Sequence, residues 1–357
     1  MSSGPGAPPA AQPAQPPAQP PAAQPQHVAG RPLGWGIVGT GGIARTVAGD
    51  LALLPDARIV AVSSRTAERA RQFAAGLAVP SGTPSAYDDV ADLVADPAVD
   101  VVYVATPHGQ HHEAALPALL AGKAVLCEKA LTVHLADAVA LVDAARARHA
   151  FLMEAVWMRF SPLVTRLHAL VRDGVIGDLR SVHASFGFNP PFDTASRIWD
   201  AAAGGGALLD LGVYTVSFAQ FLLGDPESVA VHGSLAPNGV DADATLLLRY
   251  PDGVTAVAES TLRGPVGSRA TVLGTTGRVD LAESFLDPRS IVLRRDGHEP
   301  EELTAPVEGA GYLPQLREVT ARVRAGDVES AVMPHADSLS VLGILTDALA
   351  ELGVSHP

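Results

Sequence analysis

The sequence is short of cysteine and of positive charge, and both shortages narrow the possible functions. It has a single cysteine, Cys127, so no intrachain disulfide can form, and a reducing, cytoplasmic location is expected. Its 25 lysine and arginine residues face 38 aspartate and glutamate residues, which gives a formal net charge of -13. Nucleic acids and anionic membrane surfaces bind cationic proteins, so we expect no nucleic-acid or membrane partner.

Long apolar runs and a secretory leader are also missing from the pattern. We find no apolar run with the length of a bilayer span and no signal peptide at the N-terminus. Residues 1–30 are mainly proline, alanine and glutamine and contain no aspartate, glutamate, lysine or arginine. Such a segment buries too little apolar surface to offset its ordering entropy, which predicts a disordered tail. The alternative is an arm that docks on a partner subunit.

Alternating strand and helix signals begin at Leu33. Continuous apolar runs at 99–105 and 124–127 are typical of strands that are buried on both faces of a parallel sheet. Apolar residues recur at helical spacing between such runs, for example over 135–148. This succession predicts an α/β fold whose N-terminal part, residues 31–150, is a Rossmann domain with a doubly wound parallel sheet.

The pattern changes at residue 151, after which the strand candidates alternate apolar and polar residues. These candidates are 179–186, 244–250, 255–260 and 269–273. Alternation suits a mostly antiparallel sheet with one covered face, so residues 151–334 are predicted to form an α+β substrate and oligomerisation domain. A helix over 205–223 is embedded among the strands. Residues 335–357 are predicted to form a helix that packs back on the first domain.

A glycine-rich turn joins the first predicted strand to the first predicted helix. It reads Gly39, Thr40, Gly41, Gly42, Ile43 and Ala44. Gly39 permits a tight turn, Gly41 lets the backbone approach a pyrophosphate, and Ala44 permits close helix packing. The helix N-terminus offers free N–H groups to phosphate oxygens. The turn therefore predicts a dinucleotide site.

The end of the second predicted strand bears on which dinucleotide binds. NAD sites usually have an acidic residue there for the ribose 2′-hydroxyl, whereas this chain has Ser64 and Arg65. A guanidinium makes charge-assisted contacts to a 2′-phosphate, so we expect NADP, with NAD as the alternative.

Further candidate site residues follow the predicted strands 99–105 and 124–127 of the first domain. Because ligands bind beyond the carboxyl ends of parallel strands, these residues should face the cofactor. They are Thr106, Pro107, His108, His111, Glu128 and Lys129. In the second domain, Asp210 and Tyr214 are four residues apart and should share one helical face.

At these residues the chain resembles the Gfo/Idh/MocA family of glucose–fructose oxidoreductase and inositol dehydrogenase, over about residues 33–352. Three motifs, 126–129, 152–160 and 205–214, resemble the branch of dimeric dihydrodiol dehydrogenase and NADP-dependent D-xylose dehydrogenase. The resemblance implies transfer of a hydride between the nicotinamide and a CH–OH group of a sugar, polyol or cyclic trans-diol. It also implies a homodimer or homotetramer, with the exposed sheet face as the expected contact.

The resemblance also assigns roles to individual residues. Lys129 matches the family's catalytic lysine, Tyr214 its acid/base tyrosine, and Asp210 a neighbouring acid that orients the substrate. Three further residues match the substrate pocket, namely Trp157, Arg180 and Phe186. The sequence departs from the family at Ala130, where a proline that fixes the backbone, often through a cis bond, is usual.

A tyrosine near a lysine is chemically suited to alcohol oxidation. A free phenol, with a pKa of about 10, is a poor base at neutral pH. A neighbouring ammonium stabilises the phenolate, so we expect Lys129 to lower the pKa of Tyr214 toward neutrality.

Two other functions and a metal site are alternatives to a dehydrogenase. A non-catalytic dinucleotide sensor would have no chemical need for Lys129, Asp210 and Tyr214, whereas a cofactor-retaining sugar transhydrogenase would use them all. The run from His111 to Glu113 resembles a metal cluster, but its first and last side chains would lie on different faces of a helix. No metal is expected.

Overall fold

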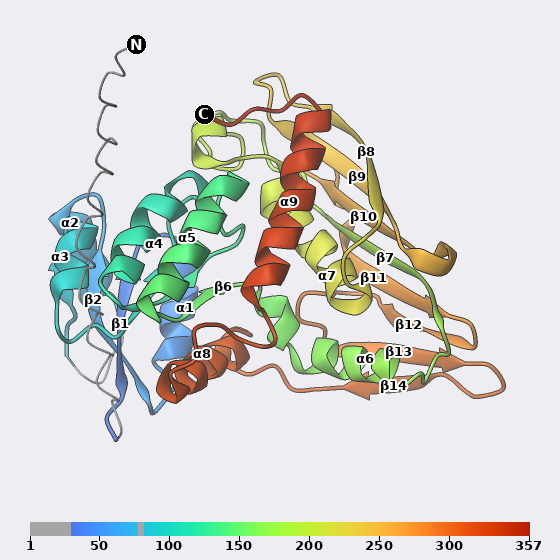
Figure 1. Cartoon of the computed structure of the whole chain (residues 1–357), viewed down its shortest axis with the longest axis horizontal. Coiled ribbons are helices and arrows are strands. Elements are labelled where there is room, and N and C mark those ends of the chain that lie inside the picture. Colours follow the sequence, from blue (N-terminus) through green and yellow to red (C-terminus); the bar gives the residue numbers. More distant parts are fainter. Residues whose placement is uncertain (1–29, 78–81) are drawn as a thin grey trace, which may run out of the picture.

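The computed structural model describes residues 30–77 and 82–357, arranged around two sheets (Figure 1). Apart from Gly30, the predicted tail of residues 1–30 lies outside the described residues. A large buried core runs through both sheets and the helices that cover them. The predicted α/β class is confirmed.

The first sheet has six parallel strands in the order β3-β2-β1-β4-β5-β6. Its strands are β1 (Leu33–Val38), β2 (Ala57–Ser63), β3 (Ser85–Tyr87), β4 (Val101–Val104), β5 (Ala124–Cys127) and β6 (Leu152–Glu154). Its helices are α1 (Gly42–Leu51), α2 (Ala67–Ala75), α3 (Val90–Ala95), α4 (His111–Leu120) and α5 (Leu135–Arg148). The strand order reverses between β1 and β4, and in such sheets the ligand crevice lies at this point.

The second sheet has eight strands in the order β14-β13-β12-β11-β7-β10-β9-β8. Its strands are β7 (Leu179–Gly187), β8 (Ser228–Leu235), β9 (Asp241–Arg249), β10 (Thr255–Thr261), β11 (Gly267–Gly274), β12 (Gly277–Leu281), β13 (Ser290–Arg295) and β14 (Glu301–Thr304). All neighbours are antiparallel except β7 and β10, which run parallel. The predicted, mostly antiparallel second sheet is therefore confirmed.

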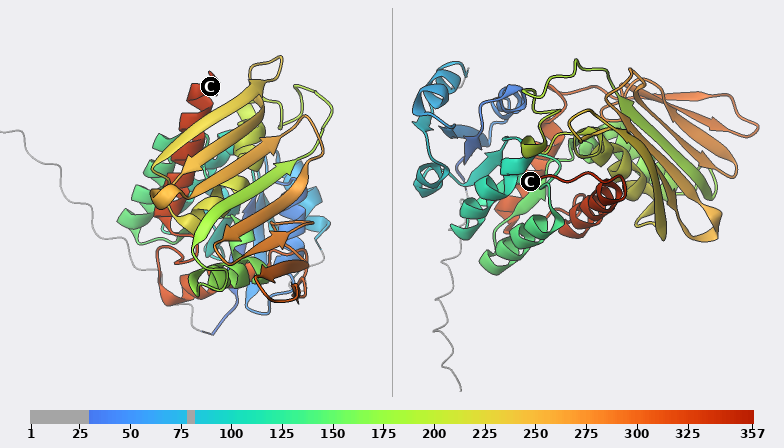
Figure 2. Two further views of the ribbon diagram at one scale, coloured as in Figure 1. Left: turned by 90° about the vertical axis from the view of Figure 1, so that its right-hand side faces the viewer. Right: turned by 90° about the horizontal axis from the view of Figure 1, so that it is seen from above.

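One face of this sheet is covered by helices and the other is open. The covering elements are α6 (Pro162–Arg172), a π-helical turn η4 (Leu208–Gly212) and α7 (Val213–Leu223). Figure 2 (left) looks onto the open face, where the strands lie in front of the helices. Helix α8 (Leu313–Ala325) packs near α1, and α9 (His335–Glu351) lies between α5 of the first domain and α7 of the second (Figure 1).

One helical stretch among the described residues, Ala201–Leu223, has the length and hydropathy of a bilayer span, so the expectation that no apolar run has that length is wrong. However, 83% of its most apolar window is buried inside the protein. The interior of a domain selects the same apolar residues as a bilayer does. This stretch is therefore the core helix of the second domain, and it carries Asp210 and Tyr214.

Candidate active site

A cavity of about 1080 Å³ runs from the glycine-rich turn after β1 to the helix that carries Tyr214. Among the predicted cofactor residues, the whole glycine-rich turn except Ala44 lines it, together with Ser64, Arg65, Thr106, Pro107, His108, Glu128 and Lys129. Ala44 is buried beneath the turn, as expected for a residue that permits close helix packing. The cavity thus joins the two domains in a single site.

The glycine-rich turn has the geometry of a dinucleotide cradle. Gly39 has a φ of +103°, and a Cβ there would lie 2.5 Å from the carbonyl oxygen of Ala105, so only glycine fits. Among the described residues, no side chain caps the N-terminus of α1 at Gly41, and the first turn holds no acidic residue. Free N–H groups and the positive end of the helix dipole therefore face the cavity, as a pyrophosphate requires.

Two arginines line the cavity where β2 ends. Arg65 and Arg69 are both exposed, and neither guanidinium has a hydrogen-bond or ion-pair partner among the residues that the structure describes. The hydroxyl of Ser64 lies 3.1 Å from that of Thr40, which ties this end of β2 to the glycine-rich turn. Asp89, which also lines the cavity, accepts a hydrogen bond from the N–H of Ala91 at the start of α3. The arginines remain available for an anion.

The two predicted histidines differ in position. His108 lines the cavity, its Nδ1 lies 2.9 Å from the carbonyl oxygen of Gly204, and burial lowers its pKa to about 3, so the ring is neutral. His111 is fully buried and is not among the lining residues. Its two ring nitrogens each lie 2.9 Å from a carbonyl oxygen, those of Ala130 and Thr106. His111 is therefore placed to hold the backbone beneath the cavity.

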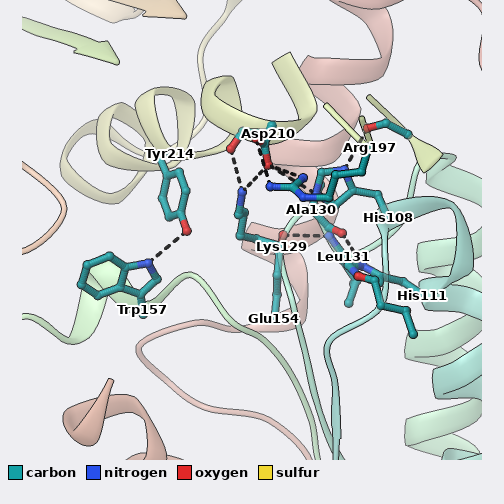
Figure 3. Close-up of polar contacts among 12 residues, drawn as sticks. His108, His111, Lys129, Ala130, Leu131, Glu154, Trp157, Arg197, Asp210 and Tyr214 are labelled. Atoms are coloured by element: carbon teal, nitrogen blue, oxygen red, sulfur yellow. Dashed lines mark hydrogen bonds and ion pairs between the residues drawn. The ribbon is translucent and has the colours of Figure 1, made fainter. Parts of the chain in front are cut away.

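Lys129 and Asp210 form the charged centre of the site (Figure 3). The ammonium of Lys129 donates to the Asp210 backbone oxygen over 2.7 Å and to its Oδ1 over 3.0 Å. Arg197 donates to the same Oδ1 over 3.1 Å. Burial alone would raise the pKa of Asp210, but the positive charges of Lys129 and Arg197 hold it well below its usual range. Asp210 is thus ionised and shared by two cations.

The peptide bond between Lys129 and Ala130 is cis. The family's proline is thus replaced here by an alanine with the peptide geometry that proline often has.

Tyr214 faces Lys129 from the first turn of α7. The ammonium nitrogen of Lys129 lies 4.8 Å from the centre of the Tyr214 ring, and the indole N–H of Trp157 donates to the Tyr214 hydroxyl over 3.0 Å. Asp210 and Tyr214 therefore both contact Lys129, as their spacing suggested.

The pKa of Tyr214 differs from the sequence expectation. Burial and then the negative charge of Glu128 raise the pKa of this phenol well above its usual value. Lys129 does not offset this, because its ammonium is bound to Asp210 and lies over the ring of Tyr214, not at its oxygen. Tyr214 is thus a neutral phenol at neutral pH, suited to donate a proton.

Aromatic side chains surround Tyr214. Phe186 lies with its ring centre 6.1 Å from that of Tyr214, and Trp157 packs against Tyr312 with ring centres 4.8 Å apart. Arg180 is different: it is exposed at the start of β7, six residues and about 20 Å along the strand from Phe186, and does not line the cavity. Trp157 and Phe186 do not line the cavity either, but both lie against Tyr214, which does, whereas Arg180 has no such contact.

Several site residues escaped the sequence analysis. Arg69 and Arg197 line the cavity, Tyr312 packs on Trp157, and Glu154 accepts a hydrogen bond from the backbone just after Lys129. Arg69 had a detectable signal, since it lies one helical turn after Arg65. Glu154 lies within the motif 152–160, but nothing in that motif singles it out, while Arg197 and Tyr312 come from segments without a motif. The described residues contain no group of three or more metal-ligating side chains.

Comparison with protein families agrees with this geometry. Residues 33–156 match the model of an oxidoreductase family with an NAD-binding Rossmann fold, and residues 164–280 match the GFO/IDH/MocA C-terminal domain. The chain belongs to the Gfo/Idh/MocA family. The predicted family is confirmed, and with it the prediction of an NAD(P)-dependent oxidoreductase that acts on a small molecule.

Relatives within the Gfo/Idh/MocA family cover almost the whole chain. Human trans-1,2-dihydrobenzene-1,2-diol dehydrogenase is 37% identical over 336 residues, 91% of this chain and 98% of the relative. Aldose-aldose oxidoreductase from Caulobacter crescentus, solved with glycerol, has a TM-score of 0.80 at 26% identity. The match covers 92% of this chain and 100% of the oxidoreductase chain. A 3-ketoreductase from Actinomadura kijaniata, solved with NADP and TDP-benzene, has a TM-score of 0.77 at 29% identity, covering 90% and 98% of the two chains.

Proposed function

We propose that this oxidoreductase uses NADP(H) and transfers a hydride to or from a secondary alcohol carbon on a ring. The observation that carries the cofactor choice is the pair Arg65 and Arg69, two unpartnered guanidinium groups where β2 ends. An adenosine 2′-phosphate would give both guanidinium groups an anionic partner through charge-assisted hydrogen bonds. The 3-ketoreductase relative that was solved with NADP supports the same choice.

Lys129 and Tyr214 can supply the proton chemistry. Bound NADP(H) supplies or accepts the hydride. In the reductive direction the neutral phenol of Tyr214 donates its proton to the substrate oxygen and is left as the phenolate; in the oxidative direction the phenolate accepts the proton of the substrate hydroxyl. Lys129, already fixed by Asp210, stabilises the negative charge that develops on that oxygen.

The surroundings of Tyr214 favour a ring with an apolar face. Trp157 and Phe186 lie against Tyr214, and Tyr312 packs on Trp157, so aromatic side chains back the phenol although they do not line the cavity themselves. Arg197 and Asp210 do line the cavity and supply polar contacts. A cyclic trans-diol presents an apolar ring and two adjacent hydroxyls, which matches this division. Dihydrodiol dehydrogenase relatives at 34–38% identity support that substrate class, and an aldose is the second candidate because of the aldose-aldose oxidoreductase neighbour.

The open face of the eight-stranded sheet is our proposed dimer contact. Leu247 on β9 and Leu273 on β11 are 43% and 39% exposed, and the residues that precede them, Leu246 and Val272, are buried on the opposite face. A second copy would cover such side chains. Light scattering on purified protein should give twice the chain mass or more, and Leu247→Arg should give the monomer mass. A monomeric wild type would reject this proposal.

A cytoplasmic location is proposed because the single cysteine, Cys127, leaves the chain without an intrachain disulfide, as is usual in a reducing compartment. Fractionation of cells that express the chain would test the location.

A substrate scan tests the function directly. NADP⁺ and NAD⁺ should each be offered with a trans-dihydrodiol, xylose, glucose and myo-inositol, using Lys129→Ala and Lys123→Ala as a matched pair. Reduction of NADP⁺ that survives in Lys123→Ala and is lost in Lys129→Ala would support the proposal. Silence with every substrate, with nucleotide retained through purification, would favour the transhydrogenase or the sensor.

A further inference from the structure

The peptide unit between Ala130 and Leu131 is held on both sides by buried side chains (Figure 3). On one side, Nδ1 of His111 lies 2.9 Å from the Ala130 carbonyl oxygen. On the other side, the N–H of Leu131 donates to Oε1 of Glu154 over 2.9 Å. The two side chains come from α4 and β6, which lie on either side of this turn.

Neither side chain has a part in the proton chemistry proposed above. Glu154 is 3% exposed and His111 is fully buried, and neither lines the cavity. Glu154 is paired in register with Cys127 at the end of β5, so its carboxyl reaches the turn that β5 leads into. A buried carboxyl is costly, and its retention at this position needs a reason.

The held peptide lies next to Lys129. From this backbone the Lys129 side chain reaches the Asp210 backbone oxygen and Oδ1, over 2.7 and 3.0 Å. The position of its ammonium therefore depends on two anchors, Asp210 at the tip of the side chain and the fixed turn at its base. Asp210 belongs to the helix that covers the second sheet, whereas Glu154 ends β6, an edge strand of the first sheet, beyond the predicted boundary at residue 150.

We propose that Glu154 is a positioning residue for Lys129. Glu154 holds the N–H of Leu131 and so fixes the turn that carries Lys129, and protonation of Glu154 changes where the Lys129 ammonium lies. The kinetic consequence rests on the proposed function, in which Lys129 stabilises the substrate oxygen. The structural consequence does not, because it concerns only the surroundings of the Lys129 side chain.

The surroundings of Glu154 place its ionisation in the working range of pH. Burial raises its pKa to about 7, while the Ser338 hydroxyl on α9, the Leu131 N–H and the charges of Arg159 and Lys129 act in the opposite direction. The neighbouring Cys127 thiol has a pKa raised well above its usual value and stays neutral. An ionised carboxylate accepts a stronger hydrogen bond than a neutral carboxyl does, so the turn is held more firmly as the pH rises through about 7.

The scarcity of lysine gives a direct spectroscopic test. The sequence has only two lysines, Lys123 and Lys129. They lie at opposite ends of β5, and Lys123 donates to the carbonyl oxygen of Val99 over 2.7 Å, away from the cavity. Protein labelled with [ε-13C]lysine should give two side-chain resonances. The Lys123→Arg variant assigns them, and the Lys123 resonance serves as an internal control.

Glu154→Gln is the informative variant, because glutamine keeps an acceptor for Leu131 but does not ionise. In the wild type, the Lys129 resonance should shift with an inflection near pH 7, and in Glu154→Gln that inflection should be lost. The Lys123 resonance should show neither effect. An inflection that persists at Lys129 in Glu154→Gln would overturn the proposal, whether or not the protein oxidises any alcohol.

Turnover provides the second readout. Glu154→Leu removes the acceptor and should lower kcat about tenfold, by misplacing Lys129, with the KM for NADP⁺ within about twofold. Glu154→Gln should restore most of kcat and lose the inflection near pH 7. Leu152→Ala, a buried change on the same strand, controls for general loosening of β6 and should leave kcat near the wild-type value. Wild-type kcat in Glu154→Leu, or equal losses in Glu154→Leu and Leu152→Ala, would overturn it.

Discussion

The indole nitrogen of Trp157 donates a hydrogen bond to the hydroxyl of Tyr214 over 3.0 Å. Trp157 belongs to η2 (Trp157–Phe160), which follows β6 and stands outside the glycine-rich and lysine motifs. Its ring is in turn packed on Tyr312, which precedes α8. The phenol is thus oriented by a chain of aromatic residues from two distant segments.

Removing this donor should weaken catalysis without abolishing it. The Trp157 hydrogen bond lowers the pKa of Tyr214, so Trp157→Phe raises it further and leaves the phenol free to rotate. We expect kcat to fall about fivefold, which corresponds to roughly 1 kcal/mol for one hydrogen bond. Steady-state kinetics would show this. Tyr312→Phe keeps the packed ring and should stay within twofold of wild type; an equal loss there would mean that packing, not the hydrogen bond, matters.

Removing the phenol itself should have a much larger effect. Tyr214→Phe deletes the proposed proton donor while preserving the ring beside Lys129, so kcat should fall by roughly 10²- to 10⁴-fold. The affinity for NADP(H), measured by calorimetry, should not change. Tyr250→Phe removes another buried phenol of the second domain and serves as the control. Wild-type turnover in Tyr214→Phe would remove this residue from the mechanism.

The arginines at the end of β2 should discriminate between the two dinucleotides. Arg65→Ala should weaken NADP(H) binding by about 1.5–3 kcal/mol, the worth of a charged hydrogen bond, and Arg69→Ala should do likewise. NAD(H) lacks the 2′-phosphate, so its affinity should barely change. Calorimetric titration of both nucleotides measures the difference, with Arg58→Ala, an exposed arginine at the opposite end of β2, as the control. Equal losses for both nucleotides would contradict the assignment.

Glu154 should also make stability depend on pH. Its pKa is raised from 4.5 to about 7 in the folded protein, so between these values the unfolded chain loses a proton that the folded protein keeps. Stability is therefore lost as the pH rises through this window, by about 3 kcal/mol. Urea unfolding at pH 5 and pH 8 should show that the free energy of unfolding of Glu154→Gln rises relative to that of the wild type at the higher pH. A constant difference between the two proteins would argue against the raised pKa.

The sequence predicted the first domain more closely than the second. The predicted helix over 135–148 and strand over 124–127 coincide with α5 and β5. The helix has apolar residues at helical spacing over its whole length, and the strand is a continuous apolar run because both faces of its sheet are buried. Both patterns are strong signals in the sequence. The predicted helix over 205–223 became a π-helical turn followed by α7, a local change that apolar periodicity does not encode.

The parts that escaped prediction depend on tertiary contacts. Strands β12, β13 and β14, at one end of the sheet, are only four to six residues long, and β14 has no buried residue, so their pattern is too short to stand out. Arg197 reaches Asp210 from an irregular segment, and nothing in its neighbours distinguishes it from a solvated arginine. The pKa of Tyr214 could not be inferred either, because it depends on burial and on the charge of Glu128.

The order of strands in the second sheet has a consequence for biosynthesis. Tyr214 and Asp210 leave the ribosome after β7 but before β8, β9, β10 and β11, and β7 gains its neighbours β10 and β11 only when these have been made. Domains generally fold as units during synthesis, N-terminal first. Most of the nucleotide half can therefore take shape early, while the apolar helix with the reacting side chains waits for its covering strands. A nascent chain that stops before β10 would expose this helix to chaperones.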